Sequence, residues 1–147
     1  MRNRSLPTDA VLPHVVYRSV PDASAWLARV FDFKEHYRHG EPVAGAQMFL
    51  GNAYVMITGV REGRATPAQA GCGTQMLTII VPDVDAHYRR AKQAGAIIVE
   101  ELHETVYGER QYAAMDLDGH RWLFSQHARD LSPEAWGATV SVRPDAQ

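Results

Sequence analysis

The chain has 147 residues, enough for one ordinary domain or for two half-size modules that share a core. Fifteen Lys and Arg against seventeen Asp and Glu give a formal net charge of −2, and no run of like charge occurs, so a nucleic-acid partner is not expected. No apolar stretch is long enough for a membrane span or a signal peptide, so we expect a cytoplasmic protein without a membrane partner. The single cysteine, Cys72, excludes an internal disulfide.

The first half of the chain predicts the order β-α-β-β-β. After a flexible N-terminus at residues 1–10, residues 11–20 are rich in β-branched side chains and predict a strand. Asp22 can cap a helix that runs to about Phe31. Three strands are then predicted, over 33–37, 45–50 and 53–60, and a hairpin turn at 51–52 joins the last two. Residues 11–60 therefore predict a first βαβββ module.

The second half predicts the same order after a linker at 61–73 that is rich in Gly, Ala, Thr and Pro. A strand is expected over 74–81, a helix from Asp83 to about Ala94, a strand over 96–102 and a hairpin within 107–127. Val-Pro-Asp follows the first strand in both halves, which supports a repeat. Residues 128–147 predict a short C-terminal helix, with Trp136 packed on the body, and a disordered tail from about 138.

The hairpin within 107–127 predicts the faces of the last strand. An Asp-Gly pair at 118–119 supplies the turn. Side chains alternate along a strand, so Trp122 and Phe124 share one face, which we expect to pack against a helix. The opposite face, which would line a cavity, holds Arg121, Leu123 and Ser125.

Four features of this chain resemble the vicinal oxygen chelate superfamily, which includes glyoxalase I, extradiol dioxygenases and bleomycin-resistance proteins. They are the paired modules, Ala-Gln-Met-Phe-Leu-Gly at 46–51, Val-Pro-Asp-Val-Asp-Ala at 81–86, and Asp-Leu-Asp-Gly-His-Arg-Trp-Leu-Phe-Ser-Gln-His at 116–127. The resemblance covers roughly residues 11–127. It implies an α+β fold in which two βαβββ modules form a curved, cup-like mixed sheet with helices on the convex side. It also implies that the concave faces bind ligands, often across a homodimer.

Metal-dependent members of the resembled superfamily hold one divalent ion with His, Gln or Glu side chains from four strands. The corresponding positions here are His14 or Val15, Met56 or Ile57, Gln75 or Met76, and Leu123. Leucine has no donor atom, so the set supplies one or two ligands where three or four are needed. We therefore expect no metal cofactor, with a divalent metal as the open alternative.

These observations predict a metal-independent protein that binds a small, partly aromatic molecule in an apolar cup, as the antibiotic-binding branch of the resembled superfamily does. A homodimer is expected, and no catalytic residue is assigned. Two alternatives stay open: a metal-dependent lyase, isomerase or dioxygenase, and a ligand-sensing interaction domain. Tyrosines would stack on the ligand and arginines would clamp a carboxylate. The expected ligand-binding residues are His14, Tyr54, Gln75, Tyr107, Arg110, Tyr112, Arg121 and Leu123.

Overall fold

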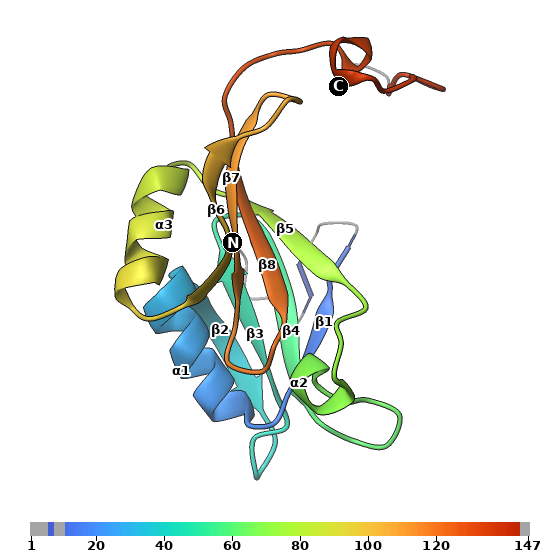
Figure 1. Ribbon diagram of the computed structural model, residues 1–147. Helices are drawn as coiled ribbons and strands as arrows, with labels where there is room; N and C mark the ends of the chain where they lie inside the picture. The colour runs from blue at the N-terminus through green and yellow to red at the C-terminus, as the bar shows by residue number, and fades with distance from the viewer. Residues whose placement is uncertain (1–5, 8–10, 145–147) are drawn as a thin grey trace.

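The computed structural model describes residues 6–7 and 11–144, and the chain forms two successive modules of the order β-α-β-β-β (Figure 1). The first module consists of β1 (His14–Tyr17), α1 (Val20–Phe31), β2 (Lys34–His39), β3 (Gly45–Leu50) and β4 (Ala53–Gly59). The second consists of β5 (Met76–Ile80), α3 (Val84–Gln93), β6 (Ile97–Glu104), β7 (Glu109–Met115) and β8 (Arg121–His127). A short helix, α2 (Pro67–Ala70), lies between the modules, and a 3-10 turn, η1 (Pro133–Trp136), follows the second.

The two modules share one sheet topology. Their strand orders are β1-β4-β3-β2 and β5-β8-β7-β6. In each sheet the first strand runs parallel to the last, and the other neighbours are antiparallel. The predicted repeat and the α+β fold, a curved two-module sheet with helices on the convex side, are confirmed. Figure 1 shows α1 and α3 on one side of the sheets, and we call the opposite side the open face.

The repeated Val-Pro-Asp plays two different parts in the helix starts. In the first module the Ser19 side chain accepts a hydrogen bond from the Asp22 N–H at 3.3 Å, so α1 begins at Val20, before the predicted Asp22. In the second module Asp83 itself is the cap, and its Oδ1 accepts from the Ala86 N–H at 3.0 Å. The residue that caps each helix, and not the repeated Val-Pro-Asp sequence, therefore decides where the helix starts.

The predicted linker contains structure that its composition did not indicate. Thr66 caps α2, and its side chain accepts from the Gln69 N–H while the Gln69 side chain accepts from the Thr66 N–H. The predicted flexible N-terminus at 1–10 lies largely outside the described residues. Residues 138–144 contain no helix or strand, and their disorder stays a prediction.

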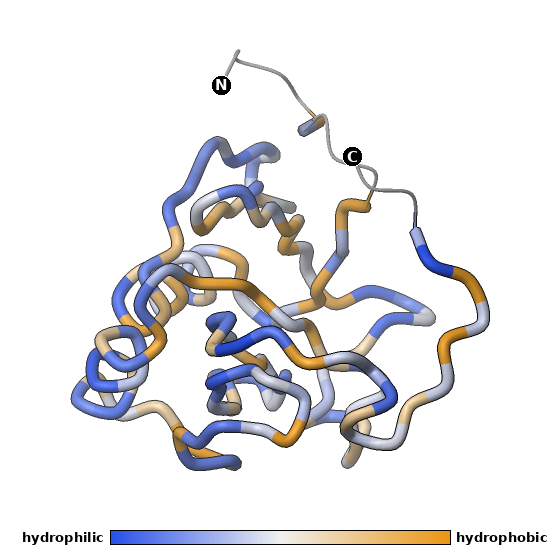
Figure 2. Tube along the Cα trace, turned by 90° about the horizontal axis from the view of Figure 1, so that it is seen from above, coloured by the Kyte–Doolittle hydropathy of each residue, from blue (hydrophilic) through white to orange (hydrophobic). Residues whose placement is uncertain are grey.

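The hydrophobic core is shared by the two modules. Phe31 at the end of α1 packs on Phe124 and Trp122 of β8, with ring centroids 4.8 and 6.1 Å apart. Both β8 rings are buried on the helix side of their sheet, as the predicted alternation requires. Hydrophobic positions recur through the body, while many peripheral connections are hydrophilic (Figure 2). In the described part of the chain, no helix has the length and apolarity needed to cross a membrane.

Candidate functional site

A hollow of about 450 Å³ lies on the open face of the second module, and we call it the open-face hollow. Three strands, β5, β7 and β8, supply most of its walls, and the turn between β6 and β7 supplies one tyrosine. The lining residues are Thr78, Ile80, Tyr107, Glu109, Gln111, Leu123, Ser125 and His127.

Strand pairing places Leu123 at the floor of this hollow. In the central strand β8, Leu123 pairs with Thr78 of β5 and with Ala113 of β7. Paired residues on neighbouring strands project to the same side of a sheet, so Thr78 and Leu123 lie next to each other on the open face. Leu123 is only 8% exposed because the surrounding side chains cover it. The floor is therefore apolar.

One rim of the open-face hollow is polar and acidic. His127 donates from Nδ1 to Glu109 Oε1 at 2.9 Å and from Nε2 to Asp130 Oδ1 at 2.8 Å. Carboxylates only accept hydrogen bonds, so both contacts together require the doubly protonated imidazolium. The bonds to Glu109 and Asp130 accordingly raise the pKa of His127. Two carboxylates around one imidazolium leave this rim with a net negative charge.

The acidic character continues from β7 to β6. The Gln111 side chain donates from Nε2 to Glu100 Oε1 at 3.5 Å, and Glu100 also lies 3.1 Å from His103 Nε2. The pair on β6 is exposed to solvent, and the hydrogen bond from Gln111 to Glu100 connects it to the hollow.

The structure brings two of the predicted site residues, Leu123 and Tyr107, into the open-face hollow. Tyr54 lines a neighbouring hollow of about 370 Å³ at the junction of β4 and β5, which shares Thr78 with the first. The Tyr54 ring stacks on Phe49 with centroids 5.5 Å apart. These three residues therefore lie around the β5 strand.

Three other predicted residues gather near α2. Gln75 and Arg121 line a hollow of about 710 Å³ beneath this helix, and Gln75 also lines a smaller hollow with His14. His14 faces outward because its neighbour Val15 is buried in the core. His14 and not Val15 therefore lies on the face opposite the core, and a role for His14 in ligand binding stays a prediction.

Two predicted residues do not face the cup, and this expectation is wrong for both. The Arg110 guanidinium donates to both carboxylate oxygens of Asp85 on α3, at 2.9 and 2.8 Å. Tyr112 is fully buried, and its hydroxyl lies 2.7 Å from Nδ1 of His87. Both positions were chosen by residue type, whereas the β7–β8 register places Tyr112 opposite Phe124 on the helix side.

The same register identifies residues that the sequence reasoning missed. Glu109 and Gln111 alternate with Arg110 and Tyr112 and therefore face the hollow, where Gln111 pairs with Ser125. Alternation along β7 would have found both only with the pairing register of β7 and β8 in hand.

The residues at the four metal-ligand positions do not fit a divalent ion. Leu123 offers hydrocarbon, and the residue at the second position, Met56, offers a buried thioether 3.7 Å from the Tyr37 hydroxyl. Divalent ions of this kind need three or four nitrogen, oxygen or thiolate ligands. Throughout residues 6–7 and 11–144, no group of three or more His, Cys, Asp or Glu side chains is arranged to hold a metal ion.

The topology of the two modules and the open-face hollow agree with the protein family that the sequence matches. The chain belongs to the Glyoxalase/Bleomycin resistance protein/Dioxygenase superfamily, whose family model matches residues 11–124. This finding confirms the family that the sequence motifs indicated.

Individual relatives agree with this assignment. TioX from Micromonospora sp. ML1 is 31% identical, with a TM-score of 0.70 over 81% of this chain and 98% of TioX. A bleomycin-binding protein in complex with bleomycin shares the fold at 17% identity and a TM-score of 0.64, over 82% of this chain and 99% of its own. An uncharacterized protein of Mycobacterium bovis is 27% identical over 146 residues, which cover 92% of this chain and 95% of that protein.

Proposed function

We propose that this protein binds a small, partly aromatic molecule in the open-face hollow without a metal. The observation that carries the proposal is Leu123, which forms an apolar floor at the position where a metal-dependent relative would need a ligand. A structural relative in complex with bleomycin supports a binding role for the fold. The hollow's apolar floor and its aromatic rim at Tyr107 fit a ring system.

Burial of the ring supplies most of the expected affinity. A planar ligand that loses about 150 Å² of apolar surface to the hollow would gain roughly 4 kcal/mol from burial. Association itself costs several kcal/mol, so polar contacts must add to this gain before binding reaches the micromolar range. Gln111, Ser125 and Glu109 lie on the lining where they can make such contacts.

The polar groups of the hollow favour binding over covalent chemistry. A nucleophilic serine needs a base within hydrogen-bond reach. Ser125 Oγ lies 3.5 Å from Glu109 Oε2, farther than the roughly 2.6–3.2 Å that joins an activated hydroxyl to its base, and both ring nitrogens of His127 are bonded to carboxylates. The described residues of the hollow therefore hold no activated hydroxyl, and we propose that the protein sequesters its ligand.

The test is a binding screen with one variant that fills the hollow. Planar aromatic antibiotics and aromatic acids are titrated by calorimetry, with and without a chelator, and at least one should bind with micromolar or better affinity that the chelator leaves unchanged. Leu123→Trp should abolish that binding while the protein stays folded, because the new ring enters the hollow and not the core. Leu123→Met, which keeps the volume, is the matched control.

Two results would count against the proposal. Wild-type affinity in a folded Leu123→Trp variant would place the ligand elsewhere. If Leu123→Trp unfolds the protein, Leu123 is a core residue. If Leu123→Met also binds its ligand tightly only when metal is added, a metal-dependent enzyme is favoured.

A further inference from the structure

The C-terminal segment that follows β8 lies beyond the part of the chain that matches the superfamily, which ends at residue 124. It is nevertheless fixed to the second module at its start. The N–H groups of Ala128 and Arg129 both donate to the Gly108 carbonyl oxygen, at 2.9 and 3.0 Å. Gly108 has a positive φ of 91°, and a Cβ atom there would lie 2.2 Å from the Arg129 carbonyl oxygen. Glycine at 108 thus allows the close approach of the segment.

This segment touches the lining of the open-face hollow at two points. The indole of Trp136 in η1 meets the Tyr107 ring edge-on, with centroids 5.7 Å apart and planes at 62°. Asp130 accepts the hydrogen bond from His127 Nε2. Tyr107 and His127 both line the hollow, so the segment reaches it through an aromatic contact and through a charged one.

The Trp136 contact leaves part of the indole available. Its side chain keeps 39% of its surface exposed, as does Tyr107. Figure 1 shows η1 well outside the sheets, near the tip of the β6–β7 hairpin, and Figure 2 shows hydrophobic positions along the C-terminal segment. An exposed indole beside a tyrosine at the rim of a hollow offers two ring surfaces to an aromatic guest.

The charges around the same rim decide which aromatic guest is favoured. Glu109 and Asp130 outnumber the single imidazolium of His127. The arginine expected to clamp a carboxylate, Arg110, is on the other face with Asp85, and Arg121 lines a different hollow. A positively charged nitrogen on the guest can be paired with Glu109 and can also lie against an aromatic ring.

We propose that the C-terminal segment forms one wall of the open-face hollow through Trp136, and that the completed site selects ligands with an aromatic ring and a positively charged nitrogen. This inference rests on the proposed binding function and names the ligand class. This ligand class replaces the aromatic acids, which the expected arginine clamp would have favoured.

Three probes with one ring system separate the contributions: 1-naphthylmethylamine, which is protonated at pH 7, 1-naphthylmethanol and 1-naphthylacetate. Calorimetry at pH 7 should give the tightest binding for the amine, by about tenfold over the alcohol, and the weakest for the acetate. Glu109→Gln should remove the preference for the amine over the alcohol. Arg129→Gln is the matched control, because it removes a charge from the same segment without removing a carboxylate from the rim.

The wall is tested by Trp136→Ala, which should weaken all three probes by about tenfold, whereas Trp136→Phe should retain most of the affinity. Trp136 is half-exposed, so neither variant should change the thermal midpoint of the body. If Leu123→Trp abolishes binding but Trp136→Ala has no effect, or if the three probes bind equally, the inference fails while the proposed function stands. If no probe binds to the wild-type protein, both fail for this ligand class.

Discussion

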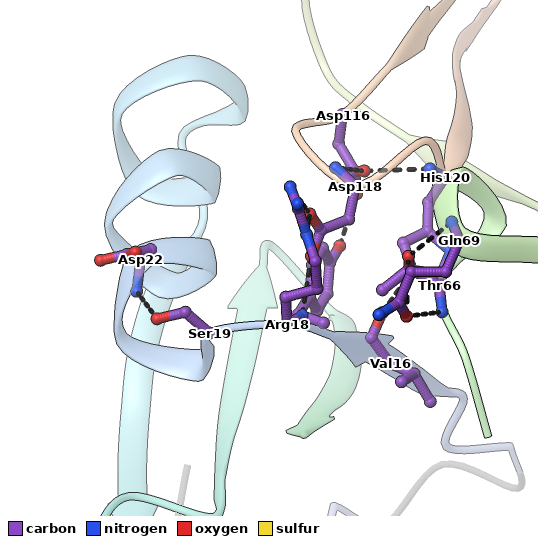
Figure 3. A network of polar contacts seen from close by, with 10 residues as sticks. Val16, Arg18, Ser19, Asp22, Thr66, Gln69, Asp116, Asp118 and His120 are labelled. Atoms are coloured by element: carbon purple, nitrogen blue, oxygen red, sulfur yellow. Dashed lines mark hydrogen bonds and ion pairs between the residues drawn. The ribbon is translucent and has the colours of Figure 1, made fainter. Parts of the chain in front are cut away.

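The Tyr17 hydroxyl donates a hydrogen bond of 2.6 Å to Asp116 Oδ2 inside the core, although the two residues lie 99 positions apart and in different modules. Trp122 Nε1 donates to the same oxygen at 2.9 Å, and Oδ1 accepts from the backbone N–H groups of Asp118 and His120. Figure 3 shows Asp116, Asp118 and His120 of the β7–β8 turn beside Val16 and Arg18 of the first module. One buried carboxylate thus satisfies four donors and joins the modules.

Removing the Tyr17 hydroxyl should destabilise the whole fold. Tyr17→Phe keeps the ring but deletes a charge-assisted hydrogen bond in a buried setting, so we expect a loss of about 1.5 to 3 kcal/mol in the free energy of unfolding. Urea denaturation followed by circular dichroism measures the loss. Tyr107→Phe is the control, because that ring is half-exposed, and it should stay within about 0.5 kcal/mol of wild type. A Tyr17→Phe variant as stable as the control would show that the contact contributes little.

Buried His87 should make the fold acid-sensitive. Its Nε2 lies 2.8 Å from the Phe31 carbonyl oxygen and its Nδ1 lies 2.7 Å from the Tyr112 hydroxyl, an arrangement that suits the neutral ring. Burial lowers the pKa of His87, while the bond to Phe31 and the charge of Asp32 oppose this and Arg90 adds to it. The neutral ring therefore contributes stability above the ordinary pKa of 6.5, and this stability is lost as the pH falls through the lowered value.

The free energy of unfolding should therefore decrease between pH 7.5 and pH 5, because the unfolded chain binds a proton that the buried ring resists. His87→Gln, whose amide can donate to a carbonyl and accept from a hydroxyl, should show a smaller pH dependence in thermal unfolding. The imidazole resonances of His87 are also followed by NMR, which distinguishes this ring from the other histidines. A normal or raised pKa for this ring would contradict the prediction.

His127 should respond to pH in the opposite direction. Hydrogen bonds to Glu109 and then to Asp130 raise its pKa, so its contacts are fully present below the ordinary value of 6.5 and are lost as the pH rises through the raised value. The bond to Asp130 helps to hold the C-terminal segment, so Trp136 should become more mobile as the pH rises above neutrality. Fluorescence anisotropy in a Trp26→Phe background measures this change as the difference from a Trp26→Phe/Trp136→Phe variant, which keeps only the buried Trp122. In the His127→Gln variant the anisotropy should not change with pH. If the wild-type anisotropy is equally independent of pH, the mobility of Trp136 does not depend on the charge of His127.

The purified protein is predicted to carry far less than one zinc, nickel, manganese or iron ion per chain. The reason is the donor set, in which Leu123 supplies no ligand atom and Met56 supplies only a thioether. Elemental analysis after purification without an affinity tag is the measurement. One tightly held ion per chain that His14→Ala removes would overturn the metal-independent proposal, and Gln75→Ala would then identify a second ligand.

Local patterns predicted the fold because strands and hairpins are coded by neighbouring residues. The Asp-Gly pair at 118–119 marked the last hairpin, and Gly119 alone in that turn takes a positive φ, of 90°. Alternation from this turn placed Leu123 on the open face and Trp122 in the core. It would also have placed Arg110 on the helix side, but that step needed the pairing register of β7, which residue type does not reveal.

Long-range contacts were beyond sequence reasoning for a different physical reason. The four donors to Asp116 come from turn backbone, from β8 and from a strand 99 positions away. Nothing local to residue 116 encodes the last of these. The contact of Trp136 with Tyr107 was expected only as packing of a helix on the body, because the rim of a hollow exists only once three strands are assembled.

The final prediction concerns assembly. Ile80 and Met76 on β5 project to the open face and are 67% and 50% exposed. Exposed apolar side chains that share one face of a strand can form part of an interaction surface, and a second copy that covered β5 would also close the hollow. We expect a homodimer at micromolar concentration, measured by light scattering on a size-exclusion peak. Ile80→Glu should shift the mass to that of the monomer, because a charge would be buried, whereas Val142→Glu, at an 84% exposed position on the C-terminal segment, should not. A monomer mass for the wild-type protein at high concentration would leave the hollow open to solvent, and ligand affinity would then have to come from one chain alone.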